Sequence, residues 1–312
     1  MKRRALFVDS FAPPILEQHL AIDAALDSAS DSAIDGRLGD GGSVQVVVDA
    51  APTSCPLPQG VRTRLLRTIH PEATVERLSG AFRGGLQPDR FPVHVTEATA
   101  AVRRDPVANW DLFHEHTKAL LTVRVCCVGA ESTGKTTLVG ALAQRHNTHQ
   151  IHEYGRGYTV EKQQAGTNDH WTTSDFVEIA EQQQRLEDAA AVGAGPLLFC
   201  DTDAMTTALW HERYQGSVSA EVVTLGRMRT YDLFVLCDVD IPWERDDIRL
   251  GENTRGAMHT RFLHELQTQR AEPWILVSGT VEERVDRVNE AVVALGLLQP
   301  SSMYRPSRFR QR

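Results

Sequence analysis

The sequence predicts an α/β protein whose carboxyl-terminal part is a parallel sheet covered by helices on both faces. Three observations support this prediction: continuous apolar runs, helical patterns between them, and a glycine-rich loop that joins the first run to the first helix. Continuous apolar runs are typical of parallel strands that are buried on both faces. The runs occupy residues 124–128, 149–152, 196–200, 233–237 and 274–277. The helical patterns occupy residues 136–146, 175–192, 255–269 and 281–295.

A smaller domain is predicted ahead of this sheet. Residues 1–120 alternate strands and helices but have too few strands for a full Rossmann-like unit, so we expect a truncated one. Residues 121–298 form the second predicted domain, and 299–312 a basic tail that is solvated and frayed. Strands of the first domain are expected at 5–8, 44–48, 73–75 and 93–96. Its helices are expected at 15–26, 61–69 and 109–121, and its loops at 28–42 and 80–92.

Composition restricts the class of protein. Hydrophobic residues make up 41% and charged residues 24% of the 312, so a packed core is expected. No apolar run reaches the ~18 residues that cross a membrane, and the N-terminal apolar stretch ends at Asp9, too early for a signal peptide. We therefore expect a cytoplasmic protein that binds no membrane. A net charge of −8 without a basic face disfavours nucleic acid and favours a small-molecule substrate. A homo-oligomer is compatible with the sequence.

The cysteines give no sign of a metal site. The sequence contains no C-x-x-C pair, so a zinc site has no basis. Four of the cysteines lie within apolar runs and are expected to be buried as small hydrophobic residues. They are Cys126, Cys127, Cys200 and Cys237.

The strand at 124–128 leads into a phosphate-binding loop. Residues 129–136, GAESTGKT, match G-x-x-x-x-G-K-[ST] between a strand and a helix, the context that a P-loop requires. In such a loop main-chain N–H groups surround the phosphates, Lys135 reaches the β- and γ-phosphates, and the Thr136 hydroxyl is a ligand of Mg²⁺. ATP and Mg²⁺ are therefore the predicted cofactors. The loop residues expected to bind ATP are Gly129, Glu131, Ser132, Thr133, Gly134, Lys135, Thr136 and Thr137.

Carboxylates follow the neighbouring strands, at the edge of the sheet where ligands bind. Asp201 ends one strand and is expected to hold Mg²⁺ directly or through water, unless it caps the next helix. Asp203, two residues later, fits a helix cap and a substrate contact equally well. Glu153 ends the second strand and is expected to accept the proton of the attacking hydroxyl, or else to pair with Arg156.

Arginines follow the fourth strand and suggest a lid over the triphosphate. Arg245, Arg249 and Arg255 would supply donors to the transferring charge, although a charge run alone is also typical of a solvated helix. Ser278 and Gly279 follow the last strand, where adenine is expected, although Ser-Gly also marks ordinary turns. The four residues predicted to carry catalysis are Lys135, Glu153, Asp201 and Arg249.

Residues 121–295 resemble the ribosylnicotinamide kinase domain of the NadR-type bifunctional proteins. The matching stretches are GAESTGKTTL, EYGRGY, DFVEIAEQQ, FCDTDAMTTALW, YQG and IPWERDDIR. The resemblance implies that ATP phosphorylates the 5′-hydroxyl of nicotinamide riboside to give nicotinamide mononucleotide. Asp247 replaces the glycine of the family's lid motif D-G-x-R. The residues expected to contact the substrate are Glu153, Tyr154, Arg156, Gln183, Asp203, Trp243 and Asp246. The tryptophans that could stack on its ring, or simply pack, are Trp171, Trp210 and Trp243.

The first domain resembles the adenylyltransferase domain of the same proteins, a nucleotidyltransferase-type domain, in a degenerate form. Ile15 and Gln18 stand where that family has two phosphate-binding histidines, and His19 is one place out of register. The family's later S-G-T-x-V-R motif reads ATAAVR at 98–103 and keeps only its Val-Arg end. We therefore predict that this domain has no adenylyltransferase activity and is structural, dimerising or nucleotide-sensing.

Two other functions remain open from the sequence. The protein could phosphorylate another nucleoside or small alcohol, which a substrate panel would distinguish. It could also be a nucleotide-binding regulator of NAD metabolism with little turnover, although Lys135, Glu153, Asp201 and Arg249 together favour an active kinase.

Overall fold

The chain forms two compact units. The computed structural model describes residues 4–9, 22, 43–48, 59–71, 73–77, 90–92, 97–167, 170–243 and 252–304. The first unit comprises residues 1–121 and 299–310, and the second is built on residues 122–298.

The second unit is built on a five-stranded sheet whose order is β6-β7-β5-β8-β9 and whose described pairings are all parallel. Its strands are β5 (Val123–Val128), β6 (Gln150–Ile151), β7 (Leu197–Asp201), β8 (Leu233–Cys237) and β9 (Trp274–Val277). All residues of β5, β7 and β8 are buried. The four cysteines of these strands have no exposed surface, which confirms the prediction that they pack as small apolar residues.

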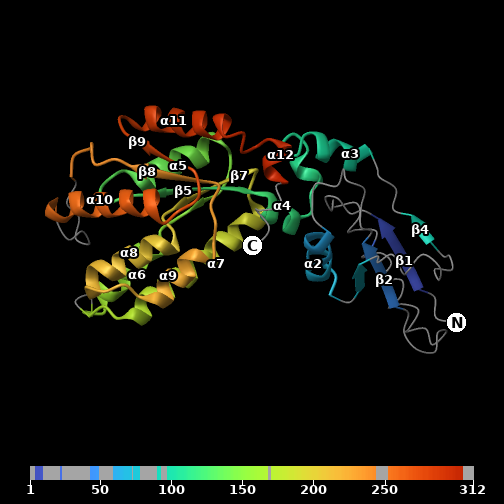
Figure 1. The fold of residues 1–312 in the computed structure, drawn as a ribbon, viewed down its shortest axis with the longest axis horizontal. Helices are drawn as coiled ribbons and strands as arrows, with labels where there is room; N and C mark the ends of the chain where they lie inside the picture. Colours follow the sequence, from blue (N-terminus) through green and yellow to red (C-terminus); the bar gives the residue numbers. More distant parts are fainter. Residues whose placement is uncertain are drawn as a thin grey trace. The chain divides into compact units, whose positions relative to one another are not determined.

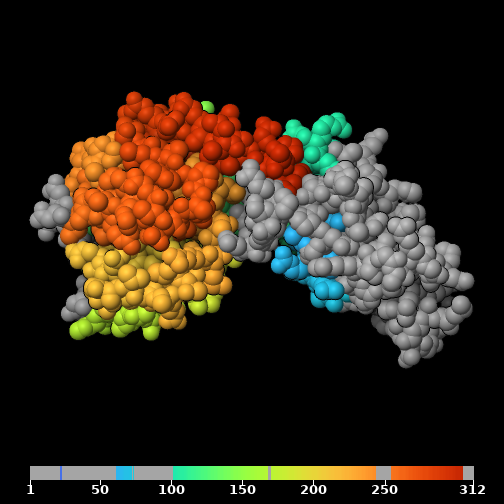
Figure 2. All heavy atoms as spheres, viewed as in Figure 1, coloured from blue at the N-terminus to red at the C-terminus, as the bar shows by residue number. Residues whose placement is uncertain are grey.

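Helices cover both faces of this sheet, and the predicted α/β class is confirmed. Figure 1 shows α5 and α11 on one side and α7 and α8 on the other. On the face seen in Figure 2, atoms of helices coloured yellow to red hide the strands. The helices are α5 (Lys135–Arg145), α6 (Tyr154–Gln164), α7 (Thr173–Gly193), α8 (Ala204–Gln215), α9 (Ala220–Arg227), α10 (Glu252–Thr268) and α11 (Val281–Ala294). Among their described residues, no helix is both long and apolar enough to cross a membrane.

Three of these helices were not expected from the sequence. The first half of α8 is buried on every side, so it shows no apolar face against a polar one. Helix α6 has no buried residue, and Gly155 and Gly157 weaken its helical pattern. Helix α9 has only eight residues and begins at the cap Ser219.

The first unit contains a four-stranded parallel sheet of order β3-β2-β1-β4. Its strands are β1 (Arg4–Asp9), β2 (Ser43–Val48), β3 (Thr74–Arg77) and β4 (Arg90–Pro92). Its helices are α2 (Gln59–Ile69), α3 (Glu97–Arg104), the 3₁₀ helix η2 (Trp110–Leu112), α4 (Glu115–Leu121) and α12 (Pro300–Met303). The prediction of a loop over residues 80–92 is wrong at its C-terminal end, because residues 90–92 form β4 and pair with β1. The helix expected at 15–26, the loop at 28–42 and the strand at 93–96 lie outside the described residues, residue 22 excepted.

The helix predicted over residues 109–121 is confirmed for η2 and α4 but is wrong as one continuous helix, because the chain breaks at Phe113. Phe113 is extended, with φ −78° and ψ 143°. Its ring is 2% exposed and packs edge to face on Trp110, with 5.6 Å between centroids. Burying both rings from one short segment therefore divides it into η2 and α4.

The expected frayed tail is also wrong for residues 300–304. Met303 is fully buried, and the hydroxyl of Tyr304 donates to the carbonyl of Val102 at 2.8 Å. Continuing α3 would pair that carbonyl with the N–H of residue 106, but Pro106 has none. Tyr304 thus supplies the missing donor, and this stabilises the turn that ends α3.

Candidate functional site

The loop between β5 and α5 has the conformation of a phosphate-binding loop. Gly129 has φ +143°, and a Cβ added there would lie 2.9 Å from the carbonyl oxygen of Cys237. Gly134, with φ +78°, occupies the left-handed region directly before α5. Both positions require glycine, because other residues rarely adopt these φ angles and because position 129 has no room for a Cβ. The loop therefore delivers the N-terminus of α5, with its free N–H groups, to the end of the sheet.

Lys135, Thr136 and Asp201 lie together at this loop. The ammonium of Lys135 donates to the carbonyl of Ala130 at 2.8 Å, and the Thr136 hydroxyl donates to Oδ2 of Asp201 at 2.5 Å. Asp201 is 1% exposed, and its Oδ1 has no hydrogen-bond partner among the described residues. A buried carboxylate oxygen without a donor, beside a threonine hydroxyl, fits a hard cation that takes oxygen ligands.

A metal cage made by the protein alone is not found in the described part of the chain. No group of three or more histidine, cysteine, aspartate or glutamate side chains there could hold a metal ion. Mg²⁺ is commonly bound through one or two protein oxygens, with water and substrate phosphates completing its ligands. Thr136 and Asp201 fit that mode of binding.

Glu153 lies between the phosphate loop and the rest of the pocket. It follows β6 and occupies the N-cap position of α6, yet its side chain makes no capping hydrogen bond. The pKa of Glu153 is raised to about 7. Removal from water is the main cause, and Asp201 adds to it, whereas Lys135 and Arg156 lower the pKa. A carboxyl group with a pKa near neutrality can accept and release a proton under ordinary conditions.

Gln183 supports this arrangement from α7. It is 1% exposed, and its Oε1 accepts the N–H of Tyr154 at 2.9 Å, which holds the start of α6 beside Glu153. Its Nε2 has no partner among the described residues, and the side chain lines the pocket. The side-chain amide can therefore donate to a ligand.

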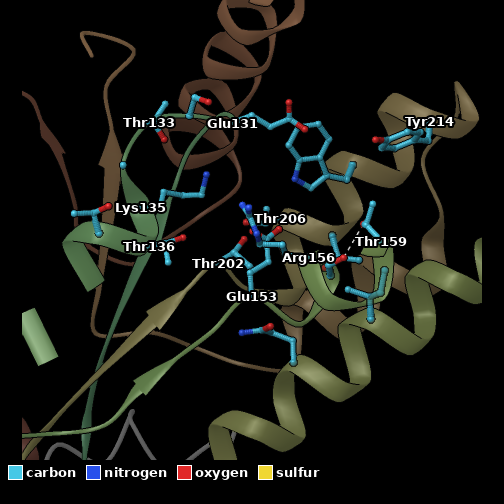
Figure 3. Close-up of a pocket in the computed structure, with 18 of the residues that line it drawn as sticks. Glu131, Thr133, Lys135, Thr136, Glu153, Arg156, Thr159, Thr202, Thr206 and Tyr214 are labelled. Carbon is cyan, nitrogen blue, oxygen red and sulfur yellow. Dashed lines mark hydrogen bonds between the residues drawn. The ribbon is translucent and has the colours of Figure 1, made fainter. Parts of the chain in front are cut away.

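A pocket of about 280 Å³ joins the phosphate loop to an aromatic wall. Figure 3 shows Lys135 and Thr136 at one end, Tyr214 across the pocket, and Glu153 and Thr202 between them. The predicted residues that line it are Glu131, Ser132, Thr133, Gly134, Lys135, Thr136, Thr137, Glu153, Arg156 and Gln183. Trp171 and Trp210, two of the tryptophans considered for stacking, also line it. The lining residues that were not predicted are Gly155, Thr159, Phe176, Ile179, Thr202, Thr206, Thr207, Tyr214, Ile241 and Pro242.

The aromatic wall consists of Trp171, Phe176, Trp210 and Tyr214. The ring of Trp171 lies 5.3 Å from that of Phe176 and 5.4 Å from that of Tyr214, between centroids. Sequence reasoning weighed Trp171 and Trp210 as stacking residues but could not choose among the tryptophans. Phe176 and Tyr214 gave no signal, since both fit a buried helix face. Trp243, the tryptophan assigned to the substrate, is not among the lining residues.

Arg255 has a different role from the one predicted. It is 9% exposed and donates to the carbonyls of Ile241 and Ser132, at 2.8 Å each. Arg284 of α11, which the sequence did not single out, donates to the carbonyl of Thr133 at 2.7 Å and forms an ion pair with Asp240. These arginines brace the loop through its carbonyls, and the contact of Arg255 with ATP stays a prediction.

Asp203 is also placed differently from the prediction. It is the N-cap of α8, its Oδ1 accepts the N–H and hydroxyl of Thr206, and its Oδ2 pairs with Arg270 at 2.7 Å. Asp203 is 1% exposed and does not line the pocket. The alternative role of a helix cap is therefore observed, and the substrate contact of Asp203 stays a prediction.

The remaining predicted residues lie elsewhere or outside the described part. Ser278 and Gly279 follow β9 and are exposed. The carbonyl of Gly279 accepts from Arg284 at 3.0 Å, and the same arginine donates to the carbonyl of Thr133, which connects Gly279 to the phosphate loop. The side chain of Tyr154 is outside the pocket lining, although its N–H is held by Gln183. Three lid residues lie outside the described residues: Arg245, Asp246 and Arg249.

The sheet, the loop and the carboxylate beside it define a P-loop protein. A family model described as "AAA domain" matches residues 124–284, just over half of the chain. The chain therefore belongs to the AAA domain family.

Within that class the chain is similar to NadR proteins. The "Trifunctional NAD biosynthesis/regulator protein NadR" of Escherichia coli (strain K12) is 33% identical over 168 residues, which cover 54% of this chain and 41% of the relative. The protein of the same name from Salmonella typhimurium (strain LT2) is 31% identical over 182 residues, 58% of this chain and 44% of the relative. The matched segment thus spans less than half the length of these relatives.

Solved NadR structures share the fold. A NadR protein crystallised in complex with NR matches with a TM-score of 0.67 and 18% identity, over 93% of this chain and 96% of the other. A NadR protein in complex with NAD and AMP-PNP matches with a TM-score of 0.69 and 16% identity, over 95% and 96%. At these identities the likeness shows the fold alone. Together with the sequence relatives, it confirms the NadR-type resemblance inferred from the motifs.

The structural role of Asp203 predicts a large effect of its substitution on stability. Asp203→Ala removes a helix cap and leaves Arg270 buried without its partner, so we expect the free energy of unfolding to fall by about 3 kcal/mol or more. Urea denaturation measures this. Glu181→Ala, which breaks the exposed pair with Arg185, should change it by less than about 0.5 kcal/mol. Equal stability of the two variants would contradict the structural role of Asp203.

Proposed function

We propose that this chain transfers the γ-phosphate of ATP to the 5′-hydroxyl of nicotinamide riboside and forms nicotinamide mononucleotide. One observation carries the proposal: a single pocket has a phosphate loop at one end, an aromatic wall at the other and a carboxyl group between them. The NadR relatives are named for NAD biosynthesis, and a NadR protein of the same fold was crystallised with NR.

The aromatic wall suits the base of this acceptor. Nicotinamide riboside carries a flat pyridinium ring with a positive charge. Aromatic faces attract such rings by stacking and by cation–π interaction, and tryptophan is the strongest partner. Trp171 and Trp210 are both half-buried in the wall, so each presents apolar surface without being lost in the core.

The chemistry is an in-line displacement at the γ-phosphorus. The 5′-oxygen of the acceptor forms a bond to phosphorus, the bond to the β–γ bridging oxygen breaks, and ADP leaves. The proton of the hydroxyl passes to the carboxylate of Glu153. Lys135 stabilises the charge on the transferring phosphoryl group and its neighbours. Thr136 and Asp201 would hold Mg²⁺, which neutralises phosphate charge when bound.

The first test is the product itself. Purified protein incubated with nicotinamide riboside and Mg-ATP should form nicotinamide mononucleotide, which mass spectrometry detects, and Lys135→Ala should abolish it. A panel of other nucleosides in the same assay tests the alternative acceptor class. If wild type binds ATP in a calorimeter but phosphorylates no member of the panel, the protein is a nucleotide-binding regulator instead.

The base assignment predicts a pH dependence. Because Glu153 must be ionised to accept the proton and its pKa is about 7, kcat/KM should fall below about pH 7, by roughly tenfold for each pH unit. Glu153→Gln should lower kcat by about 10²–10⁴-fold, abolish that limb of the profile and leave ATP affinity nearly unchanged. Asp201→Asn, by contrast, should weaken the dependence on Mg²⁺. A Glu153→Gln variant that lost only nucleoside affinity would refute the assignment.

The first unit is proposed to lack adenylyltransferase activity. The histidine positions of that motif are Ile15 and Gln18, which cannot bind phosphate as histidines do; both lie outside the described residues. Incubation of nicotinamide mononucleotide with Mg-ATP should therefore give no NAD above background, measured by chromatography. NAD formation that survives Lys135→Ala and is lost on mutation of the first unit would overturn this expectation.

A further inference from the structure

The carboxylate of Asp175 joins two helices beside the aromatic wall. Its Oδ1 accepts the hydroxyl of Tyr158 at 2.7 Å and the ammonium of Lys162 at 3.1 Å, both from α6. Its Oδ2 accepts the N–H and the hydroxyl of Thr172 at 2.6 and 2.8 Å. Thr172 is the N-cap of α7, and Asp175 lies in the first turn of that helix. One carboxylate, 9% exposed, therefore fastens α6 to the start of α7.

The residue held by this carboxylate is the direct neighbour of Trp171. Trp171 precedes Thr172 and lines the pocket. The ammonium of Lys162 lies 5.2 Å from the centroid of the Trp171 ring, and the ring of Tyr158 lies 6.2 Å from it. On the α8 side, Gln215 donates to the Trp171 carbonyl at 2.6 Å. The contacts of Trp171 with α6 are thus made by the same two side chains that bind Asp175.

Asp175 is a permanently charged group. Burial alone would raise its pKa, but hydrogen bonds from Tyr158, Thr172 and Lys162 outweigh that effect and lower the pKa to about 2. Hydrogen bonds to an ionised acceptor are roughly twice as strong as neutral ones. Asp175 does not itself line the pocket, so any effect on a ligand passes through the residues that it holds.

We propose that Asp175 is a positioning residue for the acceptor, because its carboxylate holds Trp171 in the aromatic wall of the pocket. The proposal rests on the proposed function for the identity of the acceptor. According to the proposal, the ion pair of Asp175 and Lys162 supports the affinity for the acceptor and not the affinity for ATP, although the pair contacts neither substrate.

The test is Asp175→Asn in the full chain, with KM measured separately for nicotinamide riboside and for ATP. The amide keeps the shape but loses the charge and two acceptor sites, so KM for nicotinamide riboside should rise by about tenfold, the loss of one or two charge-assisted bonds. KM for ATP and kcat should stay within about twofold, because the phosphate loop lies on another segment and Gln183, not Asp175, holds the start of α6 beside Glu153. An unchanged KM for nicotinamide riboside, or parallel increases in both KM values, would overturn the proposal.

A second capping box of this unit provides the matched control. Thr280 and Glu283 form the same arrangement at the start of α11. Glu283→Gln alters a capping carboxylate that is exposed and bonds only with Thr280, and it should leave KM for nicotinamide riboside unchanged. If Glu283→Gln raised it as much as Asp175→Asn, the effect would be general destabilisation and the proposal would be wrong. Should Asp175→Asn fail to fold, Tyr158→Phe removes a single bond to the carboxylate and should shift the same KM in the same direction.

The position of Trp171 can be measured without any turnover. Acrylamide quenching of tryptophan fluorescence, compared with and without Trp171→Phe, isolates the signal of this residue among the five tryptophans. Asp175→Asn should increase the quenching of Trp171, whereas unchanged quenching contradicts the proposal. Failure of the proposed function gives a different result, namely no product from wild type while the quenching still responds to Asp175→Asn.

Discussion

The active end of the second unit depends on the close contact between Gly129 and the main chain of β8. A Cβ at this position would meet the carbonyl of Cys237 at 2.9 Å, so the chain can leave β5 in this direction only through glycine. Buried arginines from α10 and α11 then occupy the carbonyls of Ser132 and Thr133. Main-chain N–H groups can face a phosphate only if the carbonyls of the same peptides are satisfied elsewhere. The sheet and the two arginines meet that condition together.

Three carboxylates near the ends of neighbouring strands differ because of their surroundings. Asp203 has both oxygens occupied by Thr206 and Arg270, so its role is structural. Asp201 keeps one buried oxygen without a donor and suits a cation. Glu153 makes no capping bond and is held in a poorly hydrated place, which raises its pKa to about 7. Carboxylates that look alike in the sequence therefore suit different roles, a helix cap, a proposed metal ligand and a proposed base, because their hydrogen bonds and burial differ.

The sequence predicted features that depend on consecutive residues, and it did not predict features that depend on contacts between distant residues. The strand β8 was predicted to the residue, because a buried parallel strand is a continuous apolar run. The strand β9 was also predicted to the residue from four consecutive apolar residues, although only Val277 of them is buried. The phosphate loop was predicted because its glycines, lysine and threonine are consecutive. Helix α8 was missed because its first half is buried on all sides and has no periodic pattern. The role of Asp203 could not be decided, since its partner Arg270 is 67 residues away.

Much of the acceptor half of the pocket depends on contacts that are distant in the sequence. Its aromatic and hydroxyl side chains come from α6, α7, α8 and the residue Trp171 ahead of α7, and most of them look like ordinary helix residues in the sequence. What makes them a wall is the set of polar bonds behind them, such as those of Asp175 and of Gln215. The phosphate end is fixed by the backbone of one loop packed against β8 and braced by two arginines, so it tolerates little change. The proposed acceptor end is fixed by side chains from several segments, so we expect single substitutions there to alter which acceptor fits without weakening the binding of ATP.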